Sequence, residues 1–237
     1  NELVEHDGCK VIIIANEEKL LEKESYAETR EKLIGRTLEV LPDTELITEH
    51  LIESINSPKT KAVLKTNSKL IELIFKEART NSFRVLQQTI WDFESLANCL
   101  NDEHLENKDG ISSILKLFLA IALEFKAGEL TKEDIATRPS NIVAMLRLQN
   151  PRYKEQNFKI EKSNKLFSEV DIYDQILSNE ILIDILTKGN INKENLINHI
   201  NTTAHYSNNQ EEPAWQTLWH AHEREDEKVD RALTEVN

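Results

Sequence analysis

The chain has 237 residues and a mass of 27.4 kDa, and its formal net charge at pH 7 is −13. Hydrophobic residues make up 39% and charged residues 30%, which excludes a wholly disordered protein and is typical of a globular one. The acidic balance disfavours bulk attraction to nucleic acid or anionic lipid, because phosphate binding needs clustered lysine and arginine. Only five glycines and five prolines occur, which favours long helices.

The composition also bears on the cellular compartment. Two cysteines, Cys9 and Cys99, provide neither a disulfide framework nor metal-binding spacing, so we expect a reduced, cytoplasmic protein. The longest apolar segment, residues 111–125, is interrupted by Lys116 and Glu124 and is too short to span a bilayer. The first residue is Asn and the only Met lies inside the chain, so we expect a fragment, a processed chain or a trimmed form of a longer protein.

The first predicted elements lie in residues 10–42. Four β-branched residues, Val11 to Ile14, predict a short strand buried on both faces, as in the middle of a parallel α/β sheet. Asn16 follows this strand, at the carboxyl end where ligands of such sheets bind. A charged helix is predicted over residues 17–33, and a second short strand over residues 37–41, before Pro42.

Three helices are predicted in residues 43–100. The first covers residues 45–55 behind a cap at Asp43-Thr44, and the second covers residues 61–78. The third follows Phe83-Arg84 and runs to residue 100, with apolar residues at helical spacing. The acidic stretch over residues 101–110 predicts a loop or hinge.

The remaining residues predict a second helical region. Residues 111–127 form the most hydrophobic predicted helix, and residues 131–136 a short one. We expect a mobile polar segment over residues 154–164, then helices over 170–177, 180–186 and 193–199, with a turn at Gly189. In the tail, Trp215 and Trp219 lie one helical turn apart, either packed in a core or exposed to a partner protein.

The order strand, Asn16, helix, Arg36, strand resembles the second half of an AAA+-type P-loop ATPase core, in particular the bacterial KAP-like group. In these families the strand ends in an Asn, sensor 1, which orients the attacking water, and an arginine follows at the subunit boundary. The resemblance therefore implies catalytic roles for Asn16 as sensor 1 and for Arg36 as an arginine finger, with Arg30 as a competitor. The alternatives are that Asn16 only caps the helix after it and that Arg36 is a surface arginine.

The helices of residues 43–100 resemble the helical lid that follows the core in AAA+ proteins. An arginine at the start of a lid helix, sensor 2, reaches back to the bound nucleotide, often in an Asn-x-x-Arg context. Asn81 and Arg84 match this pattern, so the resemblance implies that Arg84 binds nucleotide. A guanidinium suits this role because it is always charged and presents a planar fork of donors. The alternative is a surface arginine after an Asn that caps the helix.

Two motifs needed for catalysis are absent from the sequence. It contains no G-x-x-x-x-G-K-[ST] phosphate loop and no apolar strand that ends in paired acids. The resemblance therefore implies that ATP and Mg²⁺ bind only in the complete protein, and we expect this chain alone to be inactive as an ATPase. The pair His220 and His222 lacks zinc-site spacing, which favours a solvated helix.

The sequence thus predicts a mainly α fold: an α/β remnant of a P-loop core in residues 1–42, a helical lid in 43–100 and a helical, partner-binding domain in 101–237. The resemblance implies that ATP binding and hydrolysis are coupled to assembly or effector control, as a homo-oligomer or with a protein effector, and in bacteria to anti-phage defence. The alternative is a non-enzymatic helical protein-interaction module. In the first case Asn16 and Arg84 converge on one cleft; in the second they diverge, and Trp215 and Trp219 form the partner surface.

Overall fold

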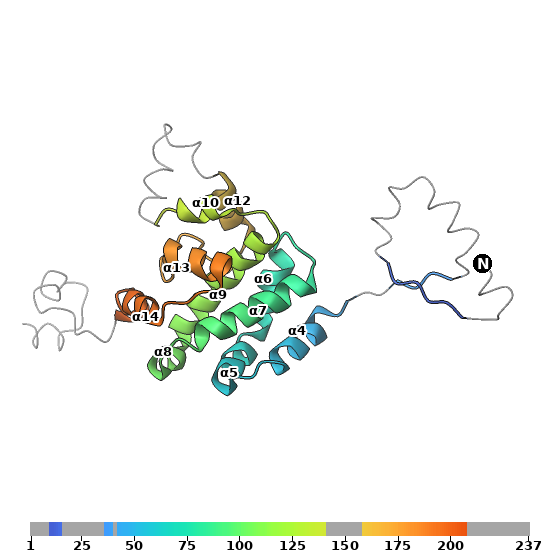
Figure 1. Cartoon of the computed structure of the whole chain (residues 1–237), viewed down its shortest axis with the longest axis horizontal. Helices are drawn as coiled ribbons and strands as arrows, with labels where there is room; N and C mark the ends of the chain where they lie inside the picture. Colours follow the sequence, from blue (N-terminus) through green and yellow to red (C-terminus); the bar gives the residue numbers. More distant parts are fainter. Residues whose placement is uncertain (1–9, 16–35, 40–41, 141–157, 208–237) are drawn as a thin grey trace, which may run out of the picture. The chain divides into compact units, whose positions relative to one another are not determined.

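The computed structural model describes residues 10–15, 36–39, 42–140 and 158–207. It divides the chain into two compact units, Asn1–Pro42 and Asp43–Asn237 (Figure 1). All the helices of the described residues belong to the second unit, and the described residues contain no strand. The fold is therefore mainly α, as the composition predicts.

The described part of the first unit differs from the prediction. Val11, Ile12, Ile13 and Ile14 belong to no helix or strand, and their exposures are 57%, 88%, 65% and 95%. Residues 37–39 of the second predicted strand form no strand either. A strand buried on both faces needs hydrogen-bonded neighbours and a layer on each side, and the described residues supply neither. The α/β arrangement is accordingly not formed here, and the predicted helix over 17–33 lies outside the described residues.

The second unit begins with four helices, α4 (Thr44–Glu53), α5 (Pro58–Thr66), α6 (Ser68–Glu77) and α7 (Phe83–Ala97). The predicted cap of the first is confirmed, since the Asp43 carboxylate accepts bonds from the amides of Glu45 and Leu46. The helix predicted over residues 61–78 is instead two helices that meet at Asn67. The Asn67 side chain donates to the Val63 carbonyl at 2.9 Å and so competes with the backbone ladder.

The stretch predicted as an acidic loop is helical. It contains α8 (Asp102–Glu106) and the start of α9 (Lys108–Lys126), and α10 (Lys132–Ala136) follows. Asn101 and Asn107 stand at the N-caps of α8 and α9, and Asn107 Oδ1 accepts from the Gly110 amide at 2.9 Å. The polar residues that indicate a loop therefore act as helix caps, and the loop prediction is wrong. The predictions of α9 and α10 are confirmed.

The last part of the unit contains α12 (Phe158–Leu166), α13 (Asn179–Ile183), the π-helix η2 (Asp184–Lys188) and α14 (Lys193–Asn201). Residues 158–164 of the expected mobile segment belong to α12, and the helix predicted over 170–177 is replaced by turns and bends. The turn predicted at Gly189 is confirmed: this residue follows η2 with a φ of 61°, a left-handed conformation that glycine adopts at low cost.

One apolar core joins these helices around α9, which packs against α6, α7 and α8 (Figure 1). Phe93 of α7 and Phe118 of α9 are fully buried, with ring centroids 6.1 Å apart. The same core includes Leu196 and Ile200 of α14. Helices on both sides of residue 100 therefore bury their apolar faces together. None of the helices in the described part of the chain is long and apolar enough to cross a membrane.

Candidate functional site

Arg84 lies at the start of α7, after the connection between α6 and α7 (residues 78–82). It is the second residue of the helix and is exposed, and it makes no ion pair or hydrogen bond with another described residue. The N-cap Ser82 makes no side-chain cap bond, and its carbonyl accepts only from Val85 and Leu86. The amides of Phe83 and Arg84 and the Arg84 guanidinium thus have no acceptor among the described residues, and the positive end of the helix favours an anion there.

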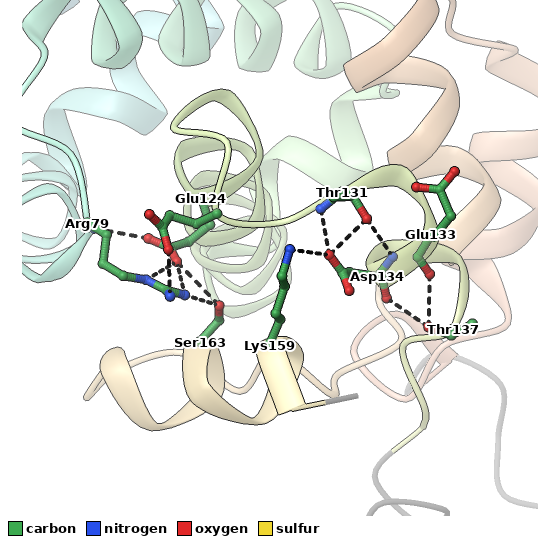
Figure 2. A network of polar contacts seen from close by, with 9 residues as sticks. Arg79, Glu124, Thr131, Glu133, Asp134, Thr137, Lys159 and Ser163 are labelled. Atoms are coloured by element: carbon green, nitrogen blue, oxygen red, sulfur yellow. Dashed lines mark hydrogen bonds and ion pairs between the residues drawn. The ribbon is translucent and has the colours of Figure 1, made fainter. Parts of the chain in front are cut away.

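Arg79, five residues earlier, is fully engaged inside the protein. Its backbone amide donates to Glu124 Oε1 at 3.0 Å and its Nε to Glu124 Oε2 at 2.7 Å, and its Nη2 also pairs with this carboxylate. Nη1 donates to Glu129 at 2.8 Å and Nη2 to the Ser163 hydroxyl at 2.7 Å. We call these four residues, Arg79, Glu124, Glu129 and Ser163, the Arg79 network, and Figure 2 labels Arg79, Glu124 and Ser163.

Glu124 is the centre of the Arg79 network, and its charge is the one that most needs partners. Its side chain is fully buried in α9, whereas the Arg79 side chain is 20% exposed. A buried carboxylate is tolerated only when it is paired and its oxygens are hydrogen-bonded, and removal of one partner of a buried pair costs about 3–5 kcal/mol. Glu124 therefore fixes Arg79, and with it the α6–α7 connection, on α9.

Helix α12 contacts this region with two side chains one helical turn apart (Figure 2). Ser163 joins the Arg79 network, and Lys159 lies 3.5 Å from Asp134 of α10. Burial opposes ionisation of Asp134, but hydrogen bonds from Thr131 and the charge of Lys159 outweigh it, so that the pKa of Asp134 is lowered. At neutral pH α12 is thus attached by polar contacts to α9, α10 and the α6–α7 connection.

The ends of α6 and α7 are held at two further points. Glu77, the last residue of α6, accepts from the amide of Ser168 at 3.1 Å and from its hydroxyl at 2.6 Å. On the apolar side, the rings of Phe75 and Phe83 lie 5.1 Å apart. Phe83 is the residue before Arg84, so this aromatic contact restrains the first turn of α7.

Arg138, which is buried, organises the segment predicted to be a helix over 170–177. The Arg138 guanidinium donates to the carbonyls of Ile172 and Leu177, at 2.7 and 2.6 Å, and to Asn179 Oδ1 at 2.8 Å. It also donates to the Asp174 carbonyl. Burial lowers the pKa of Arg138 to about 10, partly opposed by Asp174 and Asp171, so the side chain remains charged at neutral pH. These carbonyls are the acceptors that a helix would use, which explains the turns.

The described residues of the second unit contain three arginines, and their environments differ. The guanidinium groups of Arg79 and Arg138 donate their hydrogen bonds to acceptors inside the protein. Arg84 alone has no acceptor among the described residues. Because a guanidinium offers five donors and attracts any carboxylate in reach, its freedom in an acidic chain sets Arg84 apart as the candidate ligand-binding residue.

The structure locates the other predicted site residues only in part. Asn16 and Arg30 lie outside the described residues, as do Trp215 and Trp219. Arg36 belongs to the first unit, where it is exposed and lies in no helix or strand. The structure therefore does not bring the predicted catalytic pair together with Arg84.

Sequence reasoning missed the Arg79 network. A weak signal exists, because Glu124 is one of two charges that interrupt the most hydrophobic segment of the chain. A carboxylate in a helix that is apolar on most sides indicates a buried ion pair. Its partner could not be named from the sequence, since Arg79 lies 45 residues earlier.

Other features of the described residues are weaker candidates for a functional site. They contain no group of three or more His, Cys, Asp or Glu side chains arranged to hold a metal ion. A hollow of about 170 Å³ lies between α9 and residues 169–174, lined in part by Lys116, Glu169, Asp171 and Asp174. Lys116 pairs with Glu169 at 3.7 Å, so the hollow keeps an excess of acid and does not suit a phosphate.

No protein-family model matches the sequence, and neither the curated proteins nor the solved structures contain a match to it.

Proposed function

We propose that this chain is the sensor and lid portion of a P-loop ATPase of the KAP-like type. In this proposal ATP and Mg²⁺ bind in the complete protein, and Arg84 contacts the phosphates. The observation that carries it is the exposed Arg84 guanidinium in the first turn of α7, which has no acceptor among the described residues. It occurs at the position where the resemblance places sensor 2.

The surroundings of Arg84 support an anionic ligand. The exposed face of α7 is formed by Arg84, Gln88, Trp91, Ser95 and Asn98, and it contains no carboxylate. The two acids of this helix turn elsewhere: Asp92 pairs with Lys126, and Glu94 accepts from the amides of Asn56 and Ser57. A phosphate approaching this face would therefore meet one cation and no like charge of α7, in spite of the net charge of −13.

The proposal assigns the first unit to the core of the ATPase. Val11 to Ile14 are apolar yet exposed, and they would be buried as a strand in a sheet completed by other segments of the full protein. Asn16 would then orient the attacking water, and Arg36 would act on the nucleotide of a neighbouring subunit, a role worth about 10³–10⁵ in rate where it operates. The Mg²⁺ ligands would lie outside this chain.

The remaining parts of the proposal rest on the resemblance and the composition. They are a cytoplasmic location, assembly as a homo-oligomer or with a protein effector, and control of that assembly by the nucleotide, in bacteria for defence against phage.

The first test is to read the gene upstream of the codon for Asn1. The proposal expects a phosphate-loop motif and, after it, a strand that ends in paired acids. A gene that contains neither would overturn the ATPase proposal.

The second test is Arg84→Ala in the complete protein. Loss of a hydrogen bond to a charged phosphate costs about 1.5–3 kcal/mol, so the affinity for Mg·ATP should fall about tenfold or more. The matched control is Lys108→Ala, which removes an exposed, unpaired cation from the first turn of α9. Equal affinities for the two variants would contradict the role of Arg84.

An interaction module is the second candidate. It is favoured by two large apolar residues that are exposed on α4 and α7, Leu46 at 62% and Trp91 at 46%. If the upstream gene lacks the ATPase motifs, this candidate gains, and Trp91→Ala should then weaken binding to the partner without loss of stability.

A further inference from the structure

We infer that Arg79 and Glu124 are positioning residues for Arg84, and that Ser163 connects this positioning to α12. The inference rests on the proposed function of Arg84. It adds that helices beyond residue 100 set the geometry of the proposed nucleotide contact.

Arg79 and Arg84 lie close together along the chain. Arg79 and Arg84 are separated by four residues of the α6–α7 connection and the first turn of α7. Arg79 is bound to Glu124 through both its backbone amide and its side chain, at 3.0 and 2.7 Å. A backbone contact restrains the path of the chain as well as one side chain, so the direction in which the connection enters α7 depends on Glu124.

Glu124 belongs to a rigid part of the fold. Glu124 lies in α9, the helix that packs on α6, α7 and α8, and its side chain is fully buried. A site presented by a rigid element and supported by a second layer of hydrogen bonds keeps its geometry better than a free loop. The ring contact between Phe75 and Phe83 restrains the other side of the connection. Arg84 itself is left free to meet a ligand.

Ser163 links Arg79 and Glu124 to α12. The Ser163 hydroxyl accepts from Arg79 Nη2 and lies 3.3 Å from Glu124 Oε2, and it comes from a helix 84 residues later than Arg79. The Glu77–Ser168 contact joins the end of α6 to the residues after α12 in the same way. Displacement of α12 would therefore remove two of the contacts that hold the ends of the connection, of which Figure 2 shows the one between Arg79 and Ser163.

The experiment is a double-mutant cycle in the complete protein, with the Kd of a non-hydrolysed ATP analogue and Mg²⁺ as the readout. Glu124→Gln removes the charge and keeps the shape. If Glu124 acts through Arg84, Glu124→Gln should weaken analogue binding about 3–10-fold in the wild-type background and have no effect in the Arg84→Ala background. Its effect on stability should be the same in both backgrounds.

Two further variants keep the inference testable if Glu124→Gln does not fold. Ser163→Ala deletes the two hydrogen bonds of this hydroxyl, with Arg79 and with Glu124, and should weaken analogue binding less than Glu124→Gln does, again only when Arg84 is present. Asn179→Ala, which removes an acceptor of Arg138, is the control for a loss of stability elsewhere. It should leave the Kd unchanged.

Amide hydrogen exchange of residues 79–84 provides a readout independent of nucleotide. Glu124→Gln and Ser163→Ala should accelerate exchange there, whereas Asn179→Ala should not.

The outcomes separate the two proposals. If Arg84→Ala weakens analogue binding and Glu124→Gln weakens it equally in both backgrounds, the positioning inference is overturned while the function of Arg84 stands. If Arg84→Ala leaves the Kd unchanged, both are overturned. Unchanged exchange at residues 79–84 in both variants of the Arg79 network also overturns the inference.

Discussion

Gly110, in the first turn of α9, is next to the ring of Tyr206. A Cβ atom at Gly110 would lie 2.5 Å from Cζ and 2.7 Å from the hydroxyl oxygen of Tyr206. The Tyr206 hydroxyl donates to the His104 carbonyl at 3.0 Å, and the His104 and Tyr206 rings are 5.2 Å apart. Glycine at this position therefore permits the segment after α14 to pack on the start of α9.

Gly110→Ala should consequently destabilise the protein. In an open helix this change gains up to about 1 kcal/mol, but here the new methyl group must displace Tyr206, at a cost of about 1–3 kcal/mol. Urea denaturation measures the difference. In the Tyr206→Ala background the obstruction is gone, and the same change should become neutral or stabilising. A stabilising effect already in the wild-type background would contradict this packing.

Tyr206 should also make stability depend on alkaline pH. Burial raises the pKa of its phenol above the value of about 10 in an unfolded chain. A group with a raised folded pKa contributes stability that is fully present below the unfolded pKa and is lost as the pH rises towards the folded pKa. Between neutral pH and about pH 11, the unfolding free energy should fall more in the wild type than in Tyr206→Phe. Parallel losses in the two proteins would contradict it.

At the scale of elements, Glu94 joins α7 to the start of α5. One carboxylate oxygen accepts from the amides of Asn56 and Ser57, both at 2.9 Å. Glu94→Ala would leave these two donors without their acceptor and should cost about 1–3 kcal/mol. Glu94→Gln keeps a carbonyl acceptor and should cost less. Thermal unfolding checks both, with Gln88→Ala on the exposed face of α7 as a control that should change little. Equal losses for Glu94→Ala and Gln88→Ala would contradict this role.

The elements show which sequence signals suffice. Apolar spacing and the Asp43 cap predict α4, and the hydrophobic run after residue 110 predicts α9. The helix boundaries that were predicted wrongly involve polar side chains that can either mark a loop or cap a helix. Asn67 interrupts a helix because its side chain bonds the backbone and Ser112. Asn107 begins a helix, although the polar residues around it are typical of a loop.

The strand prediction at Val11–Ile14 fails for a different reason. Strand formation depends on partners that a local pattern does not contain.

The residues of the candidate site also differ in whether a local sequence pattern predicts them. Arg84 could be singled out from a short local pattern, because the start of a helix is visible in the sequence. The partners of Arg79 could not, since Glu124 and Ser163 lie 45 and 84 residues away. Arg138 is similar, with acceptors that begin 34 residues later. Local patterns carry no information about which distant carbonyl or carboxylate a buried arginine meets.

For the whole molecule, the continuous core predicts that the described part of the second unit unfolds cooperatively. With Trp215→Phe and Trp219→Phe, Trp91 of α7 becomes the sole tryptophan. Its fluorescence and the far-UV circular dichroism should then give coincident urea transitions. Phe118→Ala, in the middle of α9, should shift both by the same amount, equivalent to about 3–5 kcal/mol. Two separate transitions would show that the helices before and after residue 100 fold independently.

The Arg79 network also orders events in time during synthesis. Residues 43–100 leave the ribosome before α9 and α12, and they carry Arg79 without its acceptors. Glu124 follows 45 residues later, and Ser163 another 39 residues after that. A carboxylate that ends fully buried is costly to desolvate before its partners are present. The first turn of α7, which carries Arg84, should therefore reach its final geometry only once α12 has been translated.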